Sequence, residues 1–194
     1  ANRPRLGAVV HAGTGKTIIE SSMHPLMATL LNILVRAGFD VESSSRIENE
    51  IWNKLLINIA INPLTAIFDI KNGHLLEDDV LISVSCDAAV EVAAVANKLG
   101  LPIADIESTI KSVCRNTAEN HSSMLQDIKS GRETEIDSLC GAVVRYGEKL
   151  DVATQLNHLL KQCVKSFPMS GEAEKEDMRF TIRRIVSEVQ REAV

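Results

Sequence analysis

The longest run of apolar residues at helical spacing lies between residues 47 and 66. Its recurring positions, each four residues from the next, are Ile47, Ile51, Leu55 and Ile59. This spacing places them on one face of an α-helix. A serine cluster at residues 43–45 precedes the run and offers side chains that can cap a helix. The pattern predicts a long helix with a kink or break at Pro63, because proline has no N–H to donate.

The same spacing predicts helices along most of the remaining chain. Pro25 starts one helix that Gly38 ends, and Gly100 ends another. The charged segment from Glu172 to Val194 carries apolar residues at helical spacing, so we expect an amphipathic or partly frayed helix there. The other expected helices cover about residues 25–37, 79–99, 105–116, 123–130, 133–150 and 154–167.

Strand patterns are confined to residues 6–20. Two short apolar runs flank a turn at Gly13-Thr14-Gly15, which is typical of a hairpin or of two edge strands. Residues 39–42 are expected to be a short extended connector. Because an isolated hairpin is only marginally stable, we expect the strands to belong to a sheet whose remainder lies upstream. The chain begins at Ala1 rather than at methionine, which agrees with that expectation.

Composition excludes several classes of protein. The chain has 194 residues, 45% of them hydrophobic, and a formal charge of −5, which argues against a nucleic-acid partner. The four cysteines are scattered without paired spacing or nearby histidines, so neither a metal site nor a disulfide framework is expected. No apolar window suits a membrane span or a signal peptide, and we expect a cytoplasmic protein.

Three polar residues interrupt the long apolar helix at four-residue spacing: Lys54, Asn58 and Asn62. At about 100° per residue they form one narrow row on the helix. The row could be the solvent side of a surface helix. Its narrowness and its asparagines, which helices do not favour intrinsically, instead favour the lining of a polar cavity.

A second polar segment runs from Asn120 to Asp127, and a third from Gly131 to Asp137. Their Asn, Ser and Asp side chains are those that cap helices, and Thr134-Glu135 could simply begin one. By itself this pattern favours a structural role over a functional one.

Taken together, these segments resemble the C-terminal domain of ketopantoate reductases (2-dehydropantoate 2-reductases). That family is marked by Lys-x-x-x-Asn-x-x-x-Asn-Pro-Leu-Thr-Ala, and later by Ser-Ser-Met-x-x-Asp and Thr-Glu-Ile-Asp. The corresponding residues here are Lys54 to Ala66, Ser122 to Asp127 and Thr134 to Asp137. Found together in this order, the motifs identify the family more specifically than any one of them alone. The resemblance spans nearly the whole chain.

The resemblance implies a mostly α fold, the helical C-terminal domain of a 6-phosphogluconate-dehydrogenase-like reductase. Residues 1–20 would be the last strands of an incomplete NADPH-binding Rossmann domain. Residues 21–194 would form the all-helical substrate domain, with the substrate in the cleft between the two domains.

By the same resemblance, the reaction is the NADPH-dependent reduction of ketopantoate to pantoate in pantothenate and coenzyme A biosynthesis. Lys54 corresponds to the catalytic lysine, and Glu135 to a carboxylate that holds the cofactor's ribose or orders the site. The substrate-binding residues would be Asn58, Asn62, Ser123 and, with less support, Asn120; Asp127 is a weaker addition. No metal is implied.

These residue types suit the chemistry. Hydride transfer to a 2-keto acid leaves negative charge on the carbonyl oxygen, which an ammonium group can stabilise and protonate. Burial would lower the pKa of Lys54, whereas a neighbouring carboxylate such as Glu135 would raise it, so the sequence leaves the direction open. Amide and hydroxyl groups can orient the keto acid without adding charge.

The chain departs from the family in having no glycine fingerprint and no basic residue placed for a 2′-phosphate. We therefore expect it to be inactive without an N-terminal domain, its main partner. A homodimer and the preference for NADPH over NADH stay open. Two alternatives also stay open: a related 2-keto acid reductase of the same fold, and a non-enzymatic helical interaction or dimerisation domain.

Overall fold

The chain forms two compact units, residues Ala1–Ile51 and Trp52–Val194. The structure is a computed structural model that describes residues 2–5, 7–10, 15–167 and 171–192. Helix α2 (Ile47–Phe68) begins in the first unit and continues into the second.

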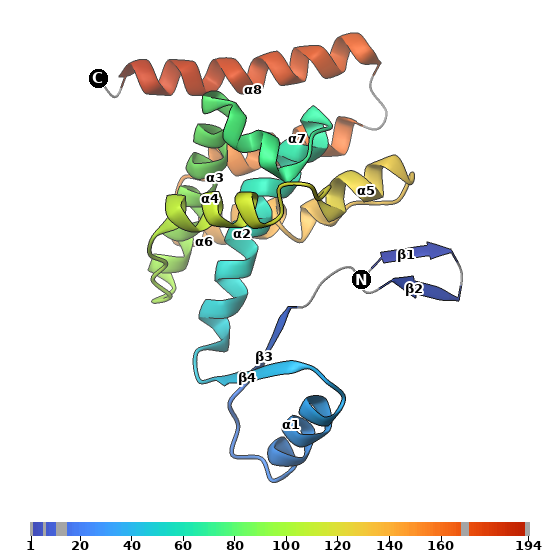
Figure 1. Cartoon of the computed structure of the whole chain (residues 1–194). Helices are drawn as coiled ribbons and strands as arrows, with labels where there is room; N and C mark the ends of the chain where they lie inside the picture. Colours follow the sequence, from blue (N-terminus) through green and yellow to red (C-terminus); the bar gives the residue numbers. More distant parts are fainter. Residues whose placement is uncertain (1, 6, 11–14, 168–170, 193–194) are drawn as a thin grey trace. The chain divides into compact units, whose positions relative to one another are not determined.

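The described residues of the first unit form two strand pairs, one complete helix and the start of α2 (Figure 1). Strands β1 (Asn2–Arg5) and β2 (Ala8–Val10) pair antiparallel. Strands β3 (Lys16–Glu20) and β4 (Asp40–Ser44) pair parallel, from Lys16 opposite Asp40 to Glu20 opposite Ser44. Helix α1 (Leu26–Arg36) connects them, because parallel neighbours need a crossover rather than a tight turn.

This arrangement corrects the expected hairpin. The antiparallel hairpin lies in residues 2–10, while β3 pairs with β4, in the segment expected to be a connector. Residues 40–44 contain only one apolar residue, Val41, so their own pattern gives little sign of a strand. The expected turn at Gly13 and Thr14 lies outside the described residues.

The two compact units divide at residue 51, whereas the predicted end of the Rossmann remnant is residue 20. Helix α1 and strand β4, expected in the helical domain, lie with β3 because the parallel pairing holds them there. None of the residues of α1 is buried, and Leu26 and Ile33 are 65% and 59% exposed. The helix therefore presents a bare apolar face within this unit.

The second unit is helical (Figure 1). After α2 come a 3-10 turn η1 (Asn72–Glu77) and helix α3 (Asp79–Lys98), which contacts α4, α6, α7 and α8. The remaining elements are α4 (Ile106–Asn116), α5 (Ser123–Lys129), the 3-10 turn η2 (Glu135–Asp137), α6 (Cys140–Leu150), α7 (Gln155–Ser166) and α8 (Glu172–Glu192).

Most expected helices are confirmed with small changes at their ends, and Pro63 lies inside α2 without ending it. The expected helix over residues 133–150 is wrong in its first half. It is divided into η2 and α6 by Leu139, whose φ and ψ of −92° and −97° are not helical. Ile136 and Leu139 are both buried, so this irregular segment packs against the core.

Helix α2 supplies much of that core. Leu56, Ile59, Leu64 and Ile67 are almost fully buried. Its 22 residues are long and apolar enough to cross a bilayer by length and composition alone, which the sequence did not lead us to expect. In the most apolar window 61% of the residues are buried inside the protein, as in the core helix of a folded domain.

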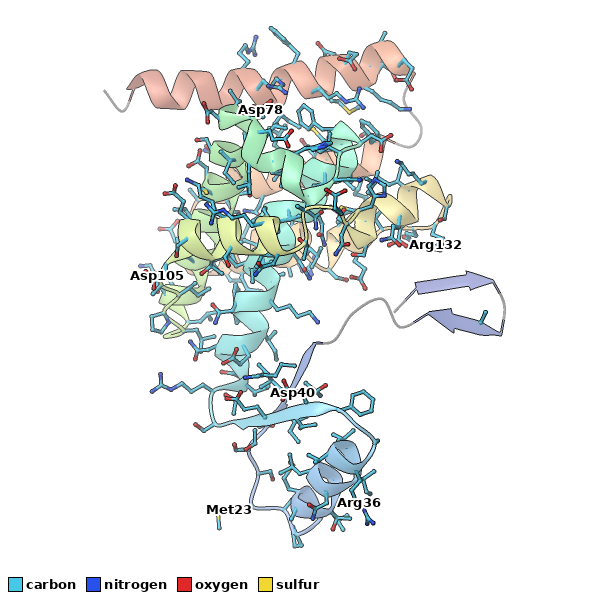
Figure 2. All side chains as sticks on the ribbon, in the orientation of Figure 1. Met23, Arg36, Asp40, Asp78, Asp105 and Arg132 are labelled. Carbon is cyan, nitrogen blue, oxygen red and sulfur yellow. The ribbon has the colours of Figure 1, made fainter. Side chains whose placement is uncertain are left out.

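Helix α8 is held to the ends of two core helices by arginines. Arg179 Nε donates to the Ile67 carbonyl at 2.8 Å, near the end of α2. Arg183 pairs with Asp78 Oδ2 at 2.6 Å, while Asp78 Oδ1 accepts from the Val80 and Leu81 N–H groups at the start of α3. Figure 2 shows Asp78 beside α8. One carboxylate thus caps α3 and anchors α8.

The Asp78–Arg183 pair makes stability depend on pH. Burial acts most strongly on the pKa of Asp78 and would raise it. The hydrogen bonds from Arg183, Leu81 and Val80 and the Arg183 charge together outweigh burial and hold the pKa below its ordinary value of 3.8. A depressed folded-state pKa gives stability that is present above the unfolded pKa and lost as pH falls through the folded one.

We expect Asp78→Asn to lower the free energy of unfolding by about 1 kcal/mol at pH 7, because one half-exposed charge-assisted bond is lost. The difference from the unmodified protein should shrink as pH falls below about 4. Urea unfolding of Asp78→Asn and of the unmodified protein at pH 7, 5 and 3.5 measures this difference in the free energy of unfolding. A difference that does not change with pH would show that the Asp78 charge is not involved.

Candidate functional site

The polar row on α2 passes from the surface toward the core. Lys54 is exposed, Asn58 and Asn62 are half-buried, and Thr65, three residues further on, is completely buried. With a rise of about 1.5 Å per residue, Lys54 and Asn62 lie about 12 Å apart along the helix axis. The row thus presents an ammonium group and two amides at increasing depth.

Thr65 connects this row to the start of α5. Its hydroxyl oxygen lies 2.8 Å from Ser122 Oγ, and both side chains are buried. It also lies 2.9 Å from the Ile61 carbonyl oxygen and 3.1 Å from that of Asn62. Ser122 Oγ in turn accepts from the Leu125 N–H at 3.2 Å and caps α5. The hydrogen bonds therefore join two segments that are far apart in sequence.

This connection places Ser123 near the end of the row. Ser123 is the first residue of α5 and is exposed. It directly follows Ser122, whose hydroxyl is bonded to Thr65, and the Thr65 hydroxyl oxygen lies close to the backbone of Asn62. Of the predicted site residues, Asn62 and Ser123 thus each stand next to one member of this buried hydroxyl pair, Asn62 through its backbone carbonyl and Ser123 as the neighbour of Ser122 in sequence.

Asn120 is held by its backbone rather than by its side chain. The Asn72 N–H donates to the Asn120 carbonyl at 3.0 Å, and the Gly73 N–H donates to the Ala118 carbonyl at 3.1 Å. Asn72 Nδ2 adds a bond of 2.9 Å to Thr117 Oγ1. These contacts tie the loop before α5 to η1 and leave the Asn120 side chain exposed.

Glu135 is exposed at the start of η2, directly before two residues that anchor this turn. Ile136 is buried, and Asp137 Oδ2 accepts from Lys165 Nζ at 2.7 Å. That hydrogen bond, together with the charges of Lys165, Lys161 and Arg145, lowers the pKa of Asp137 although slight burial opposes it. Asp137 therefore holds η2 against α7.

Within the described residues, no hydrogen bond or ion pair joins Glu135 to Lys54 or to another side chain. The two groups expected to act on cofactor and substrate are thus both exposed and uncommitted. Asp127 differs, because its Oδ1 accepts from Arg132 Nε at 2.9 Å and closes the turn after α5, where Figure 2 labels Arg132. Its carboxylate serves the fold.

Thr65 and Ser122 are the residues whose importance the sequence did not reveal. Both lie in the motifs, but the sequence assigns neither of them to the candidate site. The available signal was a serine before a short helix, which indicates an N-cap. Nothing in the sequence indicates that this cap also bonds to α2.

The side chains of this site offer amide, hydroxyl, ammonium and carboxylate groups. Among the described residues, no three His, Cys, Asp or Glu side chains are grouped to hold a metal ion. Carboxylate and ribose hydroxyl groups of a ligand are the partners that such a set can bind by hydrogen bonds.

The fold defines a helical domain whose central helix carries a polar row and is hydrogen-bonded, through Thr65, to the cap residue of a second helix. The family model "Ketopantoate reductase PanE/ApbA C terminal" matches residues 46–167, and the chain belongs to this family. The matched region contains every candidate site residue.

Individual proteins agree with the family. A 2-dehydropantoate 2-reductase of Archaeoglobus fulgidus is 35% identical over 168 residues, covering 85% of this chain and 57% of that protein. The crystal structure of a PanE/ApbA family ketopantoate reductase from Ralstonia eutropha JMP134 has a TM-score of 0.75 at 30% identity, covering 86% of this chain and 54% of the other. A complex of D-mandelate dehydrogenase with NADH also has a TM-score of 0.75, at 26% identity, covering 80% and 55%. The chain spans just over half the length of the relatives it matches.

Gly73 should be essential for the loop that carries Asn120. A Cβ added at Gly73 would lie 2.7 Å from Ala118 Cβ and 3.0 Å from its Cα. We expect Gly73→Ala to lower the free energy of unfolding by about 1–3 kcal/mol, because the loop must move to relieve the clash. Gly15→Ala is the control, since a Cβ there meets nothing within 4 Å. Thermal unfolding compares the two, and equal stability would show that Ala118 moves away freely.

Proposed function

We propose that this chain is the substrate-side part of a 2-dehydropantoate 2-reductase that reduces ketopantoate to pantoate with NADPH. The observation that carries the proposal is the polar row of α2 joined to the start of α5, in a chain that belongs to the ketopantoate reductase family. The relatives named 2-dehydropantoate 2-reductase support the choice of substrate. The cellular role would be in pantothenate and coenzyme A biosynthesis, in the cytoplasm.

Each candidate residue takes a role that suits its position. The cofactor, when bound, would supply the hydride that reduces the carbonyl carbon of the keto acid. The Lys54 ammonium group would donate a hydrogen bond to the carbonyl oxygen and then its proton, so that the oxygen, still bonded to carbon, becomes the hydroxyl group of the product. Lys54 suits this role because it is exposed and has no ion-pair partner among the described residues.

The remaining residues would bind rather than react. Asn58, Asn62 and Ser123 can donate hydrogen bonds to the carboxylate and hydroxyl of ketopantoate, and Asn120 is a further candidate for the same role. Glu135 would accept from ribose hydroxyls of the cofactor or order the site. Its exposed, uncommitted carboxylate allows either role.

The first unit supports a larger cofactor domain. Its parallel β3–α1–β4 unit is the building block of a Rossmann sheet, and its apolar helix face lacks cover. We propose that this unit, extending to residue 51 rather than 20, is the end of an NADPH-binding domain. Turnover would then require that domain. A Staphylococcus aureus ketopantoate reductase of the same fold, 19% identical, is described as dimeric, and we propose a homodimer here.

A second candidate is a reductase of another 2-keto acid. D-mandelate dehydrogenase, which is solved with NADH, shares the fold with a TM-score of 0.75. This likeness favours testing benzoylformate, the keto acid of mandelate, and NADH beside ketopantoate and NADPH.

We expect Lys54→Ala to reduce kcat about 10²–10⁴-fold, because the proton donor is removed. The measurement is NADPH oxidation with ketopantoate by the full-length polypeptide that contains this chain. Lys98→Ala, which removes an exposed lysine at the end of α3, should leave kcat unchanged.

Full activity in Lys54→Ala would contradict the assigned role. A full-length polypeptide that reduces benzoylformate but not ketopantoate would replace the proposed substrate. One that reduces neither would favour an interaction domain.

A further inference from the structure

The buried hydroxyl pair Thr65–Ser122 is the direct connection between the candidate site's two binding segments. Thr65 is fully buried and Ser122 is 5% exposed, and their oxygens lie 2.8 Å apart. Hydrogen bonds continue from this pair to the Ile61 carbonyl on α2 and to the Leu125 N–H on α5. The chain of bonds therefore runs from one helix backbone to the other.

The position of α5 depends on this connection more than that of a long helix would. The helix has seven residues, and so short a helix has little stability of its own. Met124 and Leu125 are buried on one face of α5. Apolar contacts alone, however, do not fix the direction of the helix's first turn. The hydrogen-bonded cap supplies that direction, because hydrogen bonds weaken steeply when their angle changes.

We propose that Thr65 and Ser122 are positioning residues that hold Ser123 in register with Asn62 and so set the affinity for the keto acid. This inference rests on the proposed function. Because both side chains are buried and bonded to each other, neither residue is expected to touch the substrate. Thr65 acts through Ser122, and Ser122 acts through the first turn of α5.

Steady-state kinetics of the full-length polypeptide test the proposal. Thr65→Val keeps the shape of the side chain but removes the hydroxyl. We expect it to raise KM for ketopantoate roughly fivefold to tenfold, which is the change in affinity that corresponds to the loss of about one hydrogen bond. The kcat and the KM for NADPH should change less than twofold, roughly the scatter between neutral variants. Thr65→Ser, which restores the hydroxyl, should bring KM for ketopantoate back toward the original value.

Ser85→Ala provides a matched control for lost stability. Ser85 is also a fully buried hydroxyl bonded to α2, donating to the Ala60 carbonyl at 2.7 Å, but it lies on α3 and makes no hydrogen bond to α5. Ser85→Ala should lower the melting temperature as Thr65→Val does and leave KM for ketopantoate unchanged. An equal rise of KM in both variants, or an unchanged KM in Thr65→Val, would overturn the proposal.

Hydrogen exchange separates this proposal from the proposed function. In the full-length protein, Thr65→Val should speed amide exchange in the peptide covering residues 120–130 more than Ser85→Ala does. If the unmodified protein does not reduce ketopantoate, the proposed function fails while exchange still decides whether Thr65 holds α5. Equal exchange in the two variants would refute the positioning role whatever the activity.

Discussion

The burial of α2 constrains the rest of the helical unit. Large side chains such as Leu56, Ile59 and Leu64 are fully enclosed, and each contributes about 1.5–3 kcal/mol on leaving water. Every polar group on such a helix must then be solvated at an edge or bonded to a neighbour. Asn58 and Asn62 keep partial access to solvent, whereas Thr65 is bonded to Ser122. The position of α5 follows from this requirement.

The backbone of α2 imposes a similar requirement at its end. The last carbonyls of a helix have no partner within it. Here the Thr65 carbonyl accepts from the Ile70 N–H at 3.1 Å, and the Ile67 carbonyl accepts from Arg179 on α8. One terminal carbonyl is thus satisfied by a backbone N–H just beyond the helix, and another by the guanidinium group of a distant helix. The positive charge of that group also suits the negative end of the helix dipole. Docking of α8 therefore depends on where α2 ends.

Local patterns predicted the helices well because each element has its own apolar face or cap. Strand β4 escaped prediction because a single apolar residue, Val41, gives no alternation, and its pairing with β3 depends on residues over twenty positions away. The break at Leu139 was missed because no proline interrupts residues 133–150, whereas the structure buries both Ile136 and Leu139 within the irregular segment. The polar row was visible at its four-residue spacing. Its connection to Ser122 was not, since no local pattern specifies a partner 57 positions away.

The candidate site has a common design in each of its segments, and this explains why its motifs are runs of residues. An accessible residue stands beside one whose bonds are committed to the fold: Ser123 follows the cap residue Ser122, and Glu135 lies two positions before the ion-paired Asp137. Asn120 combines both parts, with a bonded carbonyl and a free-standing side chain. A side chain that must bind a ligand cannot also use its hydrogen-bonding groups to stabilise the fold, so a neighbouring residue has to fix its backbone. The conformational entropy lost on binding is then smaller, because the fold has already restricted the backbone of each binding residue.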